Sequence, residues 1–430
     1  MSGLQMTDKV MECLDRTHLR AAQWRKLEEI LRKINTVGGF YAGRLGNAAA
    51  ALPGSLEEFS AAVPLTCKAD LLEDRLAHPP FGTNLTEPLG HYTRFCQTSG
   101  TSTGQPMAWL DTQQSWGAML ECWKQVYVAA ELRPQVDRLF FAFSFGPFLG
   151  FWTAFEAGAT DYMVIPGGGL SSQGRLEAMA RYGATVLCCT PTYALRLGEQ
   201  IGAASGVERA ALSVRKVIVA GEGGGSVPAV RERIASLWGA EVFDHHGMTE
   251  VGPVTYELPR HPCTLAVIEE AYYAEVLNPE TGEEVAEGEH GELVITTLDR
   301  VACPLLRYRT GDWVKKRFID GRLCLEGGIL SRVDDMVVVR GVNVYPSAVE
   351  EIVRQFPEVD EFLVECHKVD AMDELRLQVE LTAGAGNEVV KRIESRLKDA
   401  FLLRIPVMLA AAGSLPRYEF KSRRWRTVEN

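Results

Sequence analysis

The sequence predicts an α/β protein in which a large N-terminal domain, with mainly parallel sheets and a β-rich subdomain, precedes a small α+β C-terminal domain. The first reason is length, because 430 residues exceed what one hydrophobic core of ordinary size holds together. The second is the alternation of short apolar runs with amphipathic segments up to about residue 265, which indicates βαβ units. The third is a change of pattern there and again near residue 335.

A long helix is predicted first, over residues 20–35, where apolar side chains recur at helical spacing opposite a charged face. The alternating region follows it along the chain. Its predicted strands are residues 138–145, 184–190, 214–220 and 241–244, and its predicted helices are residues 174–183 and 228–238.

The β-rich subdomain is predicted from strands at residues 271–276, 291–297 and 313–318. We place the domain boundary at the break in residues 332–335, so the predicted domains are residues 1–333 and 334–430. The elements predicted in the tail are strands at 337–340, 361–367, 376–382 and 407–410 and helices at 346–355 and 387–400.

Composition argues against several classes of partner. The net charge of −11 is unfavourable for nucleic acid or an anionic membrane surface, because both need a basic footprint. The uncharged run 139–155 approaches the length of a membrane span, but its glycines and proline favour a buried strand, loop and helix. Ten cysteines without a CxxC pair, and a first segment without an apolar signal core, indicate reduced thiols in a cytoplasmic enzyme.

The first motif with a chemical function is TSGTSTGQP at residues 98–106. Small hydroxylated residues and glycines allow backbone N–H groups to converge on an anion, and the hydroxyls add donors. It is not the GxxxxGK[ST] phosphate loop, and a Ser/Thr/Gly-rich linker is the alternative interpretation.

Four further motifs follow in order. DHHGMTE at 244–250 ends on Glu250, a hard oxygen ligand suited to magnesium, although a lone surface carboxylate is the alternative. RYRTGD at 307–312 presents Asp312 after a glycine, where a carboxylate can bind both hydroxyls of a ribose. The others are SRVDD at 331–335, with RGVNVYP at 340–346, and PRYEFK at 416–421, whose lysine would ordinarily be solvated.

Together these motifs resemble the ordered core motifs of the adenylate-forming superfamily, which includes acyl- and aryl-CoA ligases, peptide-synthetase adenylation domains and luciferases. The RGVNVYP segment and the RYRTGD context are most similar to the phenylacetate–CoA ligase branch. The resemblance implies an ATP-dependent acid–thiol ligase that forms an acyl-adenylate and passes the acyl group to coenzyme A. It also implies that the small C-terminal domain is mobile.

The chain departs from the family pattern in three places. The phosphate loop is one residue longer than the usual TSGTTGxPK, and its final lysine is replaced by Met107. The tyrosine that usually precedes the GxTE glycine is replaced by His246. Phosphate contacts in the loop are therefore expected from backbone and hydroxyl groups.

Roles for individual residues are implied by the resemblance. Lys421 would neutralise charge at the reacting phosphorus, Glu250 would bind magnesium, Asp312 the ribose, and Arg332 the ribose or a phosphate, while Asp334 matches the hinge. The β and γ phosphates would lie against Thr98, Ser99, Gly100, Thr101, Thr103 and Gly104. Adenine would be lined by Gly221, Glu222 and Gly223, and the space between adenine and the acyl group by His246, Gly247, Met248 and Thr249.

The candidate acyl site is rich in aromatic and small residues, and it shows no Lys or Arg to pair a second carboxylate. Flat walls suit a small aromatic monocarboxylate, such as a benzoate or phenylacetate with hydroxyl or amino groups, while core packing is the alternative role for these aromatics. The residues are Phe143, Phe145, Gly146, Phe148, Pro191, Thr192, Gly221 and His245.

Several hypotheses about metal and partner remain open from the sequence. His261, Cys263 and Cys303 are candidate zinc ligands, because sulfur and imidazole suit zinc, but their spacing is irregular and buried free cysteines are the alternative. Expected small molecules are the acid, ATP, Mg²⁺ and coenzyme A. A carrier-protein thiol, a second copy of the chain as partner, and a catalytically silent acid- or nucleotide-binding protein are the competing hypotheses.

Overall fold

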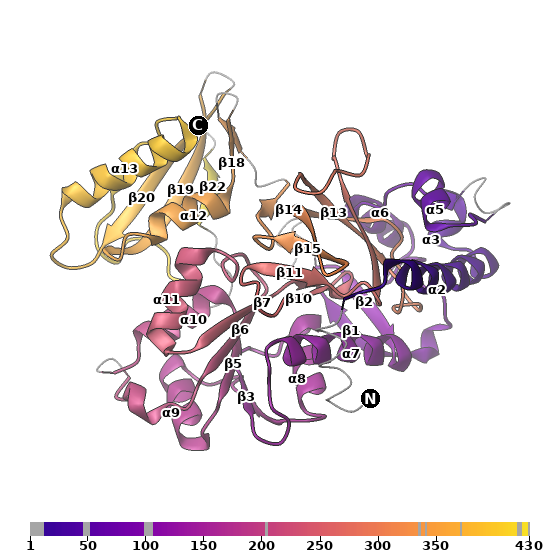
Figure 1. Ribbon diagram of the computed structural model, residues 1–430, viewed down its shortest axis with the longest axis horizontal. Helices are drawn as coiled ribbons and strands as arrows, with labels where there is room; N and C mark the ends of the chain where they lie inside the picture. Colours follow the sequence, from indigo (N-terminus) through magenta and orange to yellow (C-terminus); the bar gives the residue numbers. More distant parts are fainter. Residues whose placement is uncertain are drawn as a thin grey trace.

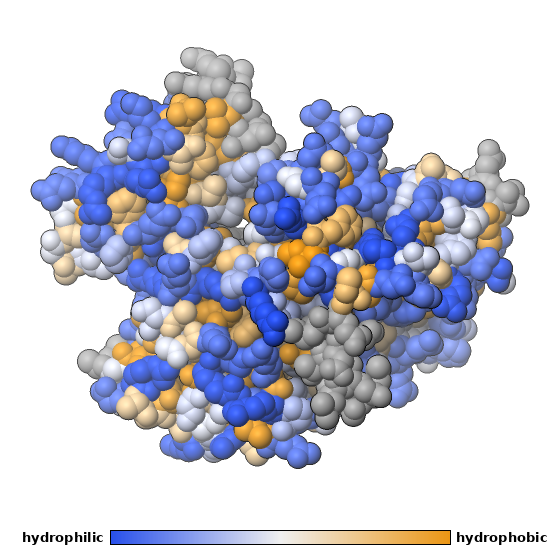
Figure 2. All heavy atoms as spheres, viewed as in Figure 1, coloured by the Kyte–Doolittle hydropathy of each residue, from blue (hydrophilic) through white to orange (hydrophobic). Residues whose placement is uncertain are grey.

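The computed structural model describes residues 13–45, 52–98, 106–202, 205–333, 337–339, 342–369, 372–418 and 424–428. A mixed α/β body is joined to a smaller α+β unit at the C-terminal end (Figure 1). Hydrophilic side chains cover most of the face drawn in Figure 2, and apolar residues lie there in smaller groups.

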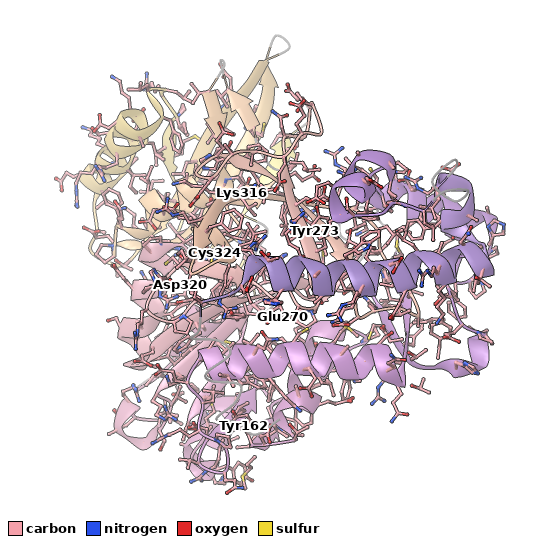
Figure 3. The ribbon with its side chains drawn as sticks, turned by 45° about the vertical axis from the view of Figure 1, so that its right-hand side comes forward. Tyr162, Glu270, Tyr273, Lys316, Asp320 and Cys324 are labelled. Atoms are coloured by element: carbon pink, nitrogen blue, oxygen red, sulfur yellow. The ribbon has the colours of Figure 1, made fainter. Side chains whose placement is uncertain are left out.

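The N-terminal helix α2 (Arg16–Val37) is longer than the predicted segment at both ends. It begins where the Asp15 side chain accepts from two backbone N–H groups of the first turn, and it ends before Gly38. Its apolar face is buried against the β-rich subdomain, beside Glu270 and Tyr273 in Figure 3. The next helices are α3 (Phe40–Leu45), α5 (Leu56–Ala62) and α6 (Lys68–Ala77), followed by the short η1 (Leu89–His91).

An antiparallel hairpin carries the predicted phosphate loop. Its strands are β1 (Tyr92–Gln97) and β2 (Ala108–Thr112), and Gln97 pairs with Ala108 beside the loop. Helix α7 (Gln113–Ala129) follows directly from β2. The motif therefore lies between two paired strands, and its residues 99–105 lie outside the described residues.

Five parallel strands form the sheet predicted from the alternating region, in the order β4-β3-β5-β6-β7. Alternate residues of β5 and β6 enter two different apolar clusters, one on each face, which explains the uninterrupted apolar runs. The strands are β3 (Arg138–Phe141), β4 (Met163–Pro166), β5 (Val186–Cys189), β6 (Lys216–Ala220) and β7 (Glu241–His245), and the helices are α8 (Leu149–Gly158), α9 (Ser172–Tyr182), α10 (Pro191–Glu199), η2 (Arg209–Ala211) and α11 (Pro228–Trp238).

The uncharged run at 139–155 is divided between β3, a loop and α8, as predicted. Within the described ranges, no helix is both long enough and apolar enough to cross a membrane. All ten cysteines are free thiols, and most are buried, which also agrees with the prediction.

The β-rich subdomain is a seven-stranded antiparallel sheet. The predicted strand at 313–318 is only the second half of a twelve-residue strand that carries the RYRTGD motif. The strands are β10 (Thr255–Glu257), β11 (Thr264–Val267), β12 (Tyr272–Leu277), β13 (His290–Thr297), β14 (Tyr308–Ile319), β15 (Arg322–Glu326) and β16 (Ser331–Arg332), and a separate small pair is β8 (Gly247–Met248) with β9 (Gly252–Pro253).

The C-terminal unit has an apolar core of its own, from Val339 to Ile405, which no residue of the preceding elements enters. This separation fits the predicted boundary between residues 333 and 334, although Asp334 lies outside the described residues and the boundary itself stays a prediction. The elements are β17 (Val337–Val339), β18 (Val342–Val344), α12 (Pro346–Arg354), β19 (Val359–Val369), β20 (Met372–Leu381), α13 (Asn387–Phe401), β21 (Val407–Leu409) and β22 (Trp425–Val428).

Candidate active site

Four strands of the parallel sheet bring the predicted site segments to one edge. The carboxyl ends of β3, β5, β6 and β7 lead directly into residues 142–148, 190–192, 221–223 and 246–250. Ala220 is in register with His245 across β6 and β7. The predicted adenine loop, residues 221–223, and the DHHGMTE motif therefore start side by side. The carboxyl edge of such a sheet is where ligands bind in open α/β folds.

Thr98 closes the base of the predicted phosphate loop. Its backbone N–H donates to the Met107 carbonyl at 3.0 Å, and its hydroxyl accepts from the Met107 N–H at 2.9 Å. The Met107 side chain is buried in the main core, so it does not replace the family's lysine at the phosphates. Ser99, Gly100, Thr101, Thr103 and Gly104 lie outside the described residues.

Glu250 is a buried carboxylate with a lysine ammonium group beside it. The residue is only 4% exposed, and its Oε1 lies 3.1 Å from Nζ of Lys68, the first residue of α6. The positive charge compensates the cost of burying the carboxylate. Lys68 was not predicted, because a single lysine far from every motif has no local feature that distinguishes it from a solvated one.

A buried ion pair connects the β1–β2 hairpin to the turn that carries Glu250. Arg300 binds both carboxylate oxygens of Asp111 on β2, at 2.7 and 2.6 Å. The same guanidinium donates to the carbonyl oxygens of Thr249 and Glu250 at 2.8 and 2.7 Å. The Asp111–Arg300 pair was not predicted from the sequence, because neither residue belongs to a motif.

The predicted ribose ligand, Asp312, lies on β14 opposite Arg332 on β16. Arg332 NH1 is 2.7 Å from Oδ1, and His246 Nε2 is 3.1 Å from Oδ2. That second contact does not have hydrogen-bond alignment, and both atoms are buried without a hydrogen bond. Burial alone raises the pKa of Asp312, but His246 and Arg332 outweigh it and lower the pKa to about 2. The carboxylate therefore remains ionised.

Two glycines of the motifs are required by their surroundings. A Cβ on Gly311, whose φ is 73°, would lie 2.5 Å from the Arg332 guanidinium. A Cβ on Gly247 would lie 2.8 Å from the Gly252 carbonyl across the β8–β9 pair. A side chain at either position would displace the groups around His246 and Asp312.

The adenine loop is connected to a helix start. Gly221, with φ of 94°, and Gly223 are exposed, while the Glu222 carboxylate accepts from the backbone N–H of Thr192 at 2.9 Å. Thr192 is in the first turn of α10, so the Glu222 charge lies at the positive end of that helix. Pro191 and Thr192 themselves are buried.

The predicted aromatic residues divide into two groups. Phe143 is buried and stacks on Phe151, with ring centroids 4.1 Å apart, so the core-packing alternative applies to it. Phe145 and Phe148 are half-buried, as is Gly146, and Phe145 adopts a φ of 50°. A left-handed backbone at a bulky residue is strained and is commonly found at functional sites.

His245 ends β7 with its imidazole almost fully buried. Nδ1 lies 2.6 Å from the Thr255 carbonyl oxygen, and the ring is 4.2 Å from that of Trp123. Burial lowers the pKa of His245 to about 3, so the imidazole is neutral at physiological pH.

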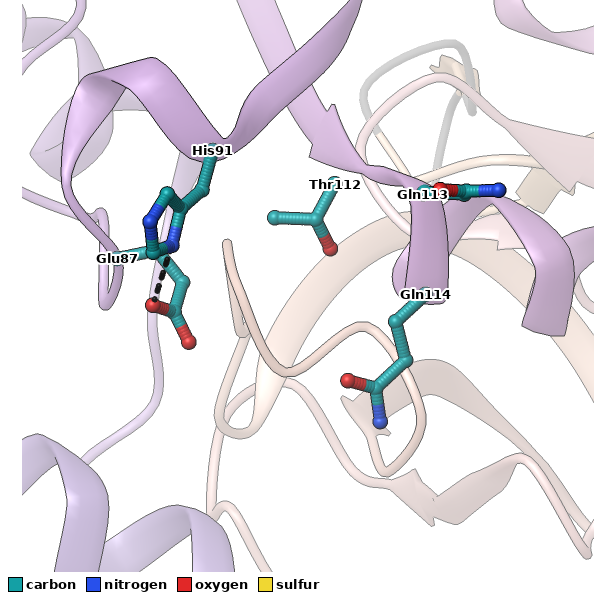
Figure 4. Close-up of a pocket in the computed structure, with 5 residues that line it drawn as sticks. All are labelled: Glu87, His91, Thr112, Gln113 and Gln114. Atoms are coloured by element: carbon teal, nitrogen blue, oxygen red, sulfur yellow. Dashed lines mark hydrogen bonds and ion pairs between the residues drawn. The ribbon is translucent and has the colours of Figure 1, made fainter.

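Two open surface pockets lie away from this edge. One is lined by Glu87, His91, Thr112, Gln113 and Gln114, at the end of the β1–β2 hairpin opposite the phosphate loop (Figure 4). The other surrounds the amino ends of β3 and β4, at the opposite edge of the parallel sheet. Neither includes a predicted site residue.

The C-terminal unit contacts the site edge. Arg424 donates to the Thr192 hydroxyl at 3.5 Å and binds Glu361 of its own unit at 2.7 Å. Glu351 of α12 accepts from the Ala229 backbone N–H at 2.9 Å. Lys421 lies outside the described residues, so its predicted role stays a prediction.

The zinc hypothesis is not supported by the arrangement of its three candidates. Cys303 is buried in the main core beside Asn84, whereas His261 is exposed on the turn between β10 and β11. Across the described ranges, no group of three or more His, Cys, Asp or Glu side chains is arranged to hold a metal ion. The buried-thiol alternative therefore describes Cys303, and the described structure does not bring the three candidates together as a zinc site.

Two protein-family models match this chain, one in each of its predicted domains. Residues 89–298 match the model of the AMP-binding enzyme family, and residues 341–426 match that of the AMP-binding enzyme C-terminal domain. A phenylacetate-coenzyme A ligase of Thermus thermophilus is 30% identical over 95% of this chain and 96% of its own. The Escherichia coli phenylacetate-coenzyme A ligase is also 30% identical, over 96% of this chain and 95% of its own.

One solved structure is similar in both domains. It is a 2-hydroxyisobutyryl-CoA ligase in its postadenylation state with 2-HIB-AMP, with a TM-score of 0.89 and 27% identity, covering 97% of this chain and 91% of that one. The same ligase in its thioesterification state, with the same coverage, gives a TM-score of 0.71 at 28% identity. The domains of this chain are thus arranged more like the former state than the latter.

Proposed function

Because the chain belongs to the AMP-binding enzyme family and is related over almost its whole length to phenylacetate-coenzyme A ligases, we propose that it activates a small aromatic carboxylic acid with ATP and transfers the acyl group to coenzyme A. In the first half, a carboxylate oxygen bonds to the α-phosphorus of ATP and pyrophosphate leaves. In the second, the thiol of coenzyme A bonds to the acyl carbon and AMP leaves.

The buried Asp312 carboxylate is the observation that carries the nucleotide part of the proposal. Its pKa of about 2 keeps it ionised, Arg332 holds one oxygen, and His246 Nε2 lies 3.1 Å from the other. A ribose diol supplies O–H donors, and an ionised carboxylate is a strong acceptor for them.

At the phosphate end, cationic side chains compensate for the missing loop lysine. With Met107 in the core, Lys68 is the cation held against Glu250, at 3.1 Å, and we assign to it the charge that relatives place in the loop. The Asp111–Arg300 pair positions the turn that carries Glu250. Preorganised charge of this kind contributes to phosphoryl transfer mainly through positioning and electrostatics.

Magnesium fits Glu250 as a ligand, because the carboxylate is a buried hard oxygen donor. The described side chains offer no further metal-ligand cluster there, so phosphate oxygens and water would complete the shell. When bound, magnesium would supply positive charge to the phosphate oxygens.

The C-terminal unit would supply Lys421 to the α-phosphorus during the first half. Interactions of Glu351 with Ala229 and of Arg424 with Thr192 hold this unit against the sheet edge. Thiol entry would require the unit to turn, with Asp334 as the proposed hinge, since one position of the unit cannot serve both halves. This chain superposes better on the postadenylation state of the 2-hydroxyisobutyryl-CoA ligase than on its thioesterification state. That difference supports a domain arrangement suited to adenylate formation.

An aromatic acid is favoured by Phe145 and Phe148, which are half-buried beside the carboxyl edge of the sheet. The predicted acyl-site residues include no Lys or Arg that could pair with a second carboxylate on the substrate. Free coenzyme A is proposed as the acyl acceptor because two relatives that match almost the whole chain are named as coenzyme A ligases.

The decisive test measures pyrophosphate release by the purified chain with MgATP and a panel of aryl and short fatty acids, and then thioester formation with coenzyme A or with phosphopantetheinyl carrier protein. We expect an aryl acid and coenzyme A to give the highest kcat/KM. Equal rates with hexanoate would refute the aromatic assignment, and a thioester on the carrier alone would refute coenzyme A. Absence of pyrophosphate release with every acid would refute the proposed function itself.

A further inference from the structure

Arg424 is a buried arginine at the contact between the C-terminal unit and the large domain. Only 6% of the residue is exposed. Its guanidinium binds both carboxylate oxygens of Glu361 on β19, at 2.7 and 3.2 Å, and the Glu350 carboxylate of α12 lies 3.3 Å from NH1. Two carboxylates of its own unit therefore compensate the buried charge and hold the planar guanidinium in one orientation.

The same guanidinium reaches across the domain contact, where α12 packs beside α11 (Figure 1). NH1 donates to the hydroxyl of Thr192, in the first turn of α10, at 3.5 Å. The backbone N–H of Thr192 in turn donates to Glu222 of the predicted adenine loop at 2.9 Å. Arg424 is thus connected through one residue to the loop that is predicted to line adenine.

Arg424 also adjoins the segment that carries the predicted catalytic lysine, since it is three residues after Lys421 in the sequence. Its guanidinium carbon lies 5.8 Å from the ring centroid of Tyr418, the last described residue before that segment. Its backbone carbonyl accepts from the Val364 N–H of β19 at 2.7 Å. The two described residues that flank 419–423 are therefore in contact, and the second of them is anchored to the sheet of the C-terminal unit.

We propose that Arg424 is a positioning residue that holds the Lys421 segment at the carboxyl edge of the parallel sheet while the acyl-adenylate forms. This inference rests on the proposed function and deepens it. The contacts of Arg424 with Glu361 and Glu350 lie within one unit and move with it, whereas the Thr192 contact exists only when that unit lies at this edge. Arg424 should therefore matter for adenylation and not for acyl transfer.

The test measures two half-reactions of the full chain at saturating substrates, ATP–pyrophosphate exchange and thioester formation from preformed acyl-AMP, for Arg424→Lys. Lysine retains the charge but has no planar fork, so it cannot bind both Glu361 oxygens and reach Thr192 as well. We expect kcat for exchange to fall by about 10- to 100-fold, the range for one charge-assisted hydrogen bond and for a misplaced catalytic group. Thioester formation should remain near native.

A double-mutant cycle tests whether Arg424 acts through the lysine. In the Lys421→Ala background, Arg424→Lys should have almost no further effect on exchange, since the group that it positions is absent. The matched control is Arg426→Lys, because Arg426 lies two residues further on and pairs with Glu365 of the same strand, β19, at 3.0 Å. This control should retain the native kcat in both half-reactions.

Thr192→Val is the second variant, because it removes the acceptor across the domain contact and leaves every residue of the C-terminal unit unchanged. Its kcat for exchange should fall by about two- to ten-fold, the range for one hydrogen bond. A folding defect in the C-terminal unit cannot produce that loss.

Native exchange in Arg424→Lys or in Thr192→Val would overturn the inference. An equal loss in both half-reactions of Arg424→Lys, or an undiminished effect of this change in the Lys421→Ala background, would overturn it as well. In each of these cases pyrophosphate release by the native chain would still support the proposed function. Absence of release by the native chain with every acid would overturn both.

Discussion

Removing the Glu351 carboxylate should slow adenylation selectively. Helix α11 begins at Pro228 after Val227, whose side chain cannot accept a hydrogen bond from the first N–H groups of the helix. Glu351, from α12 of the C-terminal unit, accepts from the Ala229 N–H at 2.9 Å. The cap of one domain's helix is thus supplied by the other domain, and only while the two are in contact.

The magnitude follows from the geometry. A charge at a helix N-terminus stabilises by roughly 0.3–1 kcal/mol when partly exposed, and a single hydrogen bond by about 0.5–1.5 kcal/mol. Glu351 is half-buried, so we expect about 1 kcal/mol for Glu351→Ala, which is roughly a five-fold shift between domain arrangements at 25 °C. Glu351→Gln, which retains an oxygen acceptor but not the charge, should lose less.

The assay separates the half-reactions, with ATP–pyrophosphate exchange for adenylation and thioester formation from preformed acyl-AMP for transfer. Glu351→Ala should lower the first by about five-fold or less and leave the second equal or faster. The matched control is Glu394→Ala, because Glu394 on α13 pairs with Arg404 of the same unit. An equal loss in both half-reactions, or no change in either, would refute the capping argument.

Three further outcomes are expected. Lys421→Ala should lower adenylation by several hundred-fold, about 3–4 kcal/mol, while transfer from preformed acyl-AMP persists, and near-native pyrophosphate exchange would remove Lys421 from its proposed role. Asp312 has a folded-state pKa of about 2 against an ordinary 3.8, so it contributes on the order of 2 kcal/mol of stability above pH 4 that is lost as the pH falls toward 2. Urea unfolding at several pH values should show a shallower decline for Asp312→Asn, and identical pH profiles would contradict the Arg332 pairing. Asp111→Ala leaves Arg300 buried without its carboxylate, so the free energy of unfolding should fall by about 3–5 kcal/mol, and a loss below 1 kcal/mol would show that the pair is not the structural link.

Elements with strong local signals were predicted closely. The helix at 228–238 matches α11 at both ends, because a proline at its start and Gly239 after its end are local signals. The strand at 138–145 was predicted too long, since the apolar run continues into the loop after β3 and apolar composition alone does not mark where pairing stops. The long β14 was found only in part, because the turn residues of RYRTGD resemble a strand end whereas Gly311 continues the strand through an irregularity.

The residues proposed to bind nucleotide and metal lie in short contiguous motifs, whereas the charged partners of the buried groups are brought together only by the tertiary structure. Motifs such as DHHGMTE and RYRTGD are contiguous, so the residues that would bind nucleotide and metal were identified from the order of the chain. The partners that hold those residues are distant in sequence, as Lys68 is from Glu250 and Asp111 is from Arg300. A charge is costly to bury wherever it falls, but which counter-charge compensates it depends on which strands and helices become neighbours. The orientation of the His245 imidazole is decided in the same way, by the Thr255 carbonyl on β10, a strand distant in sequence that packs against β7.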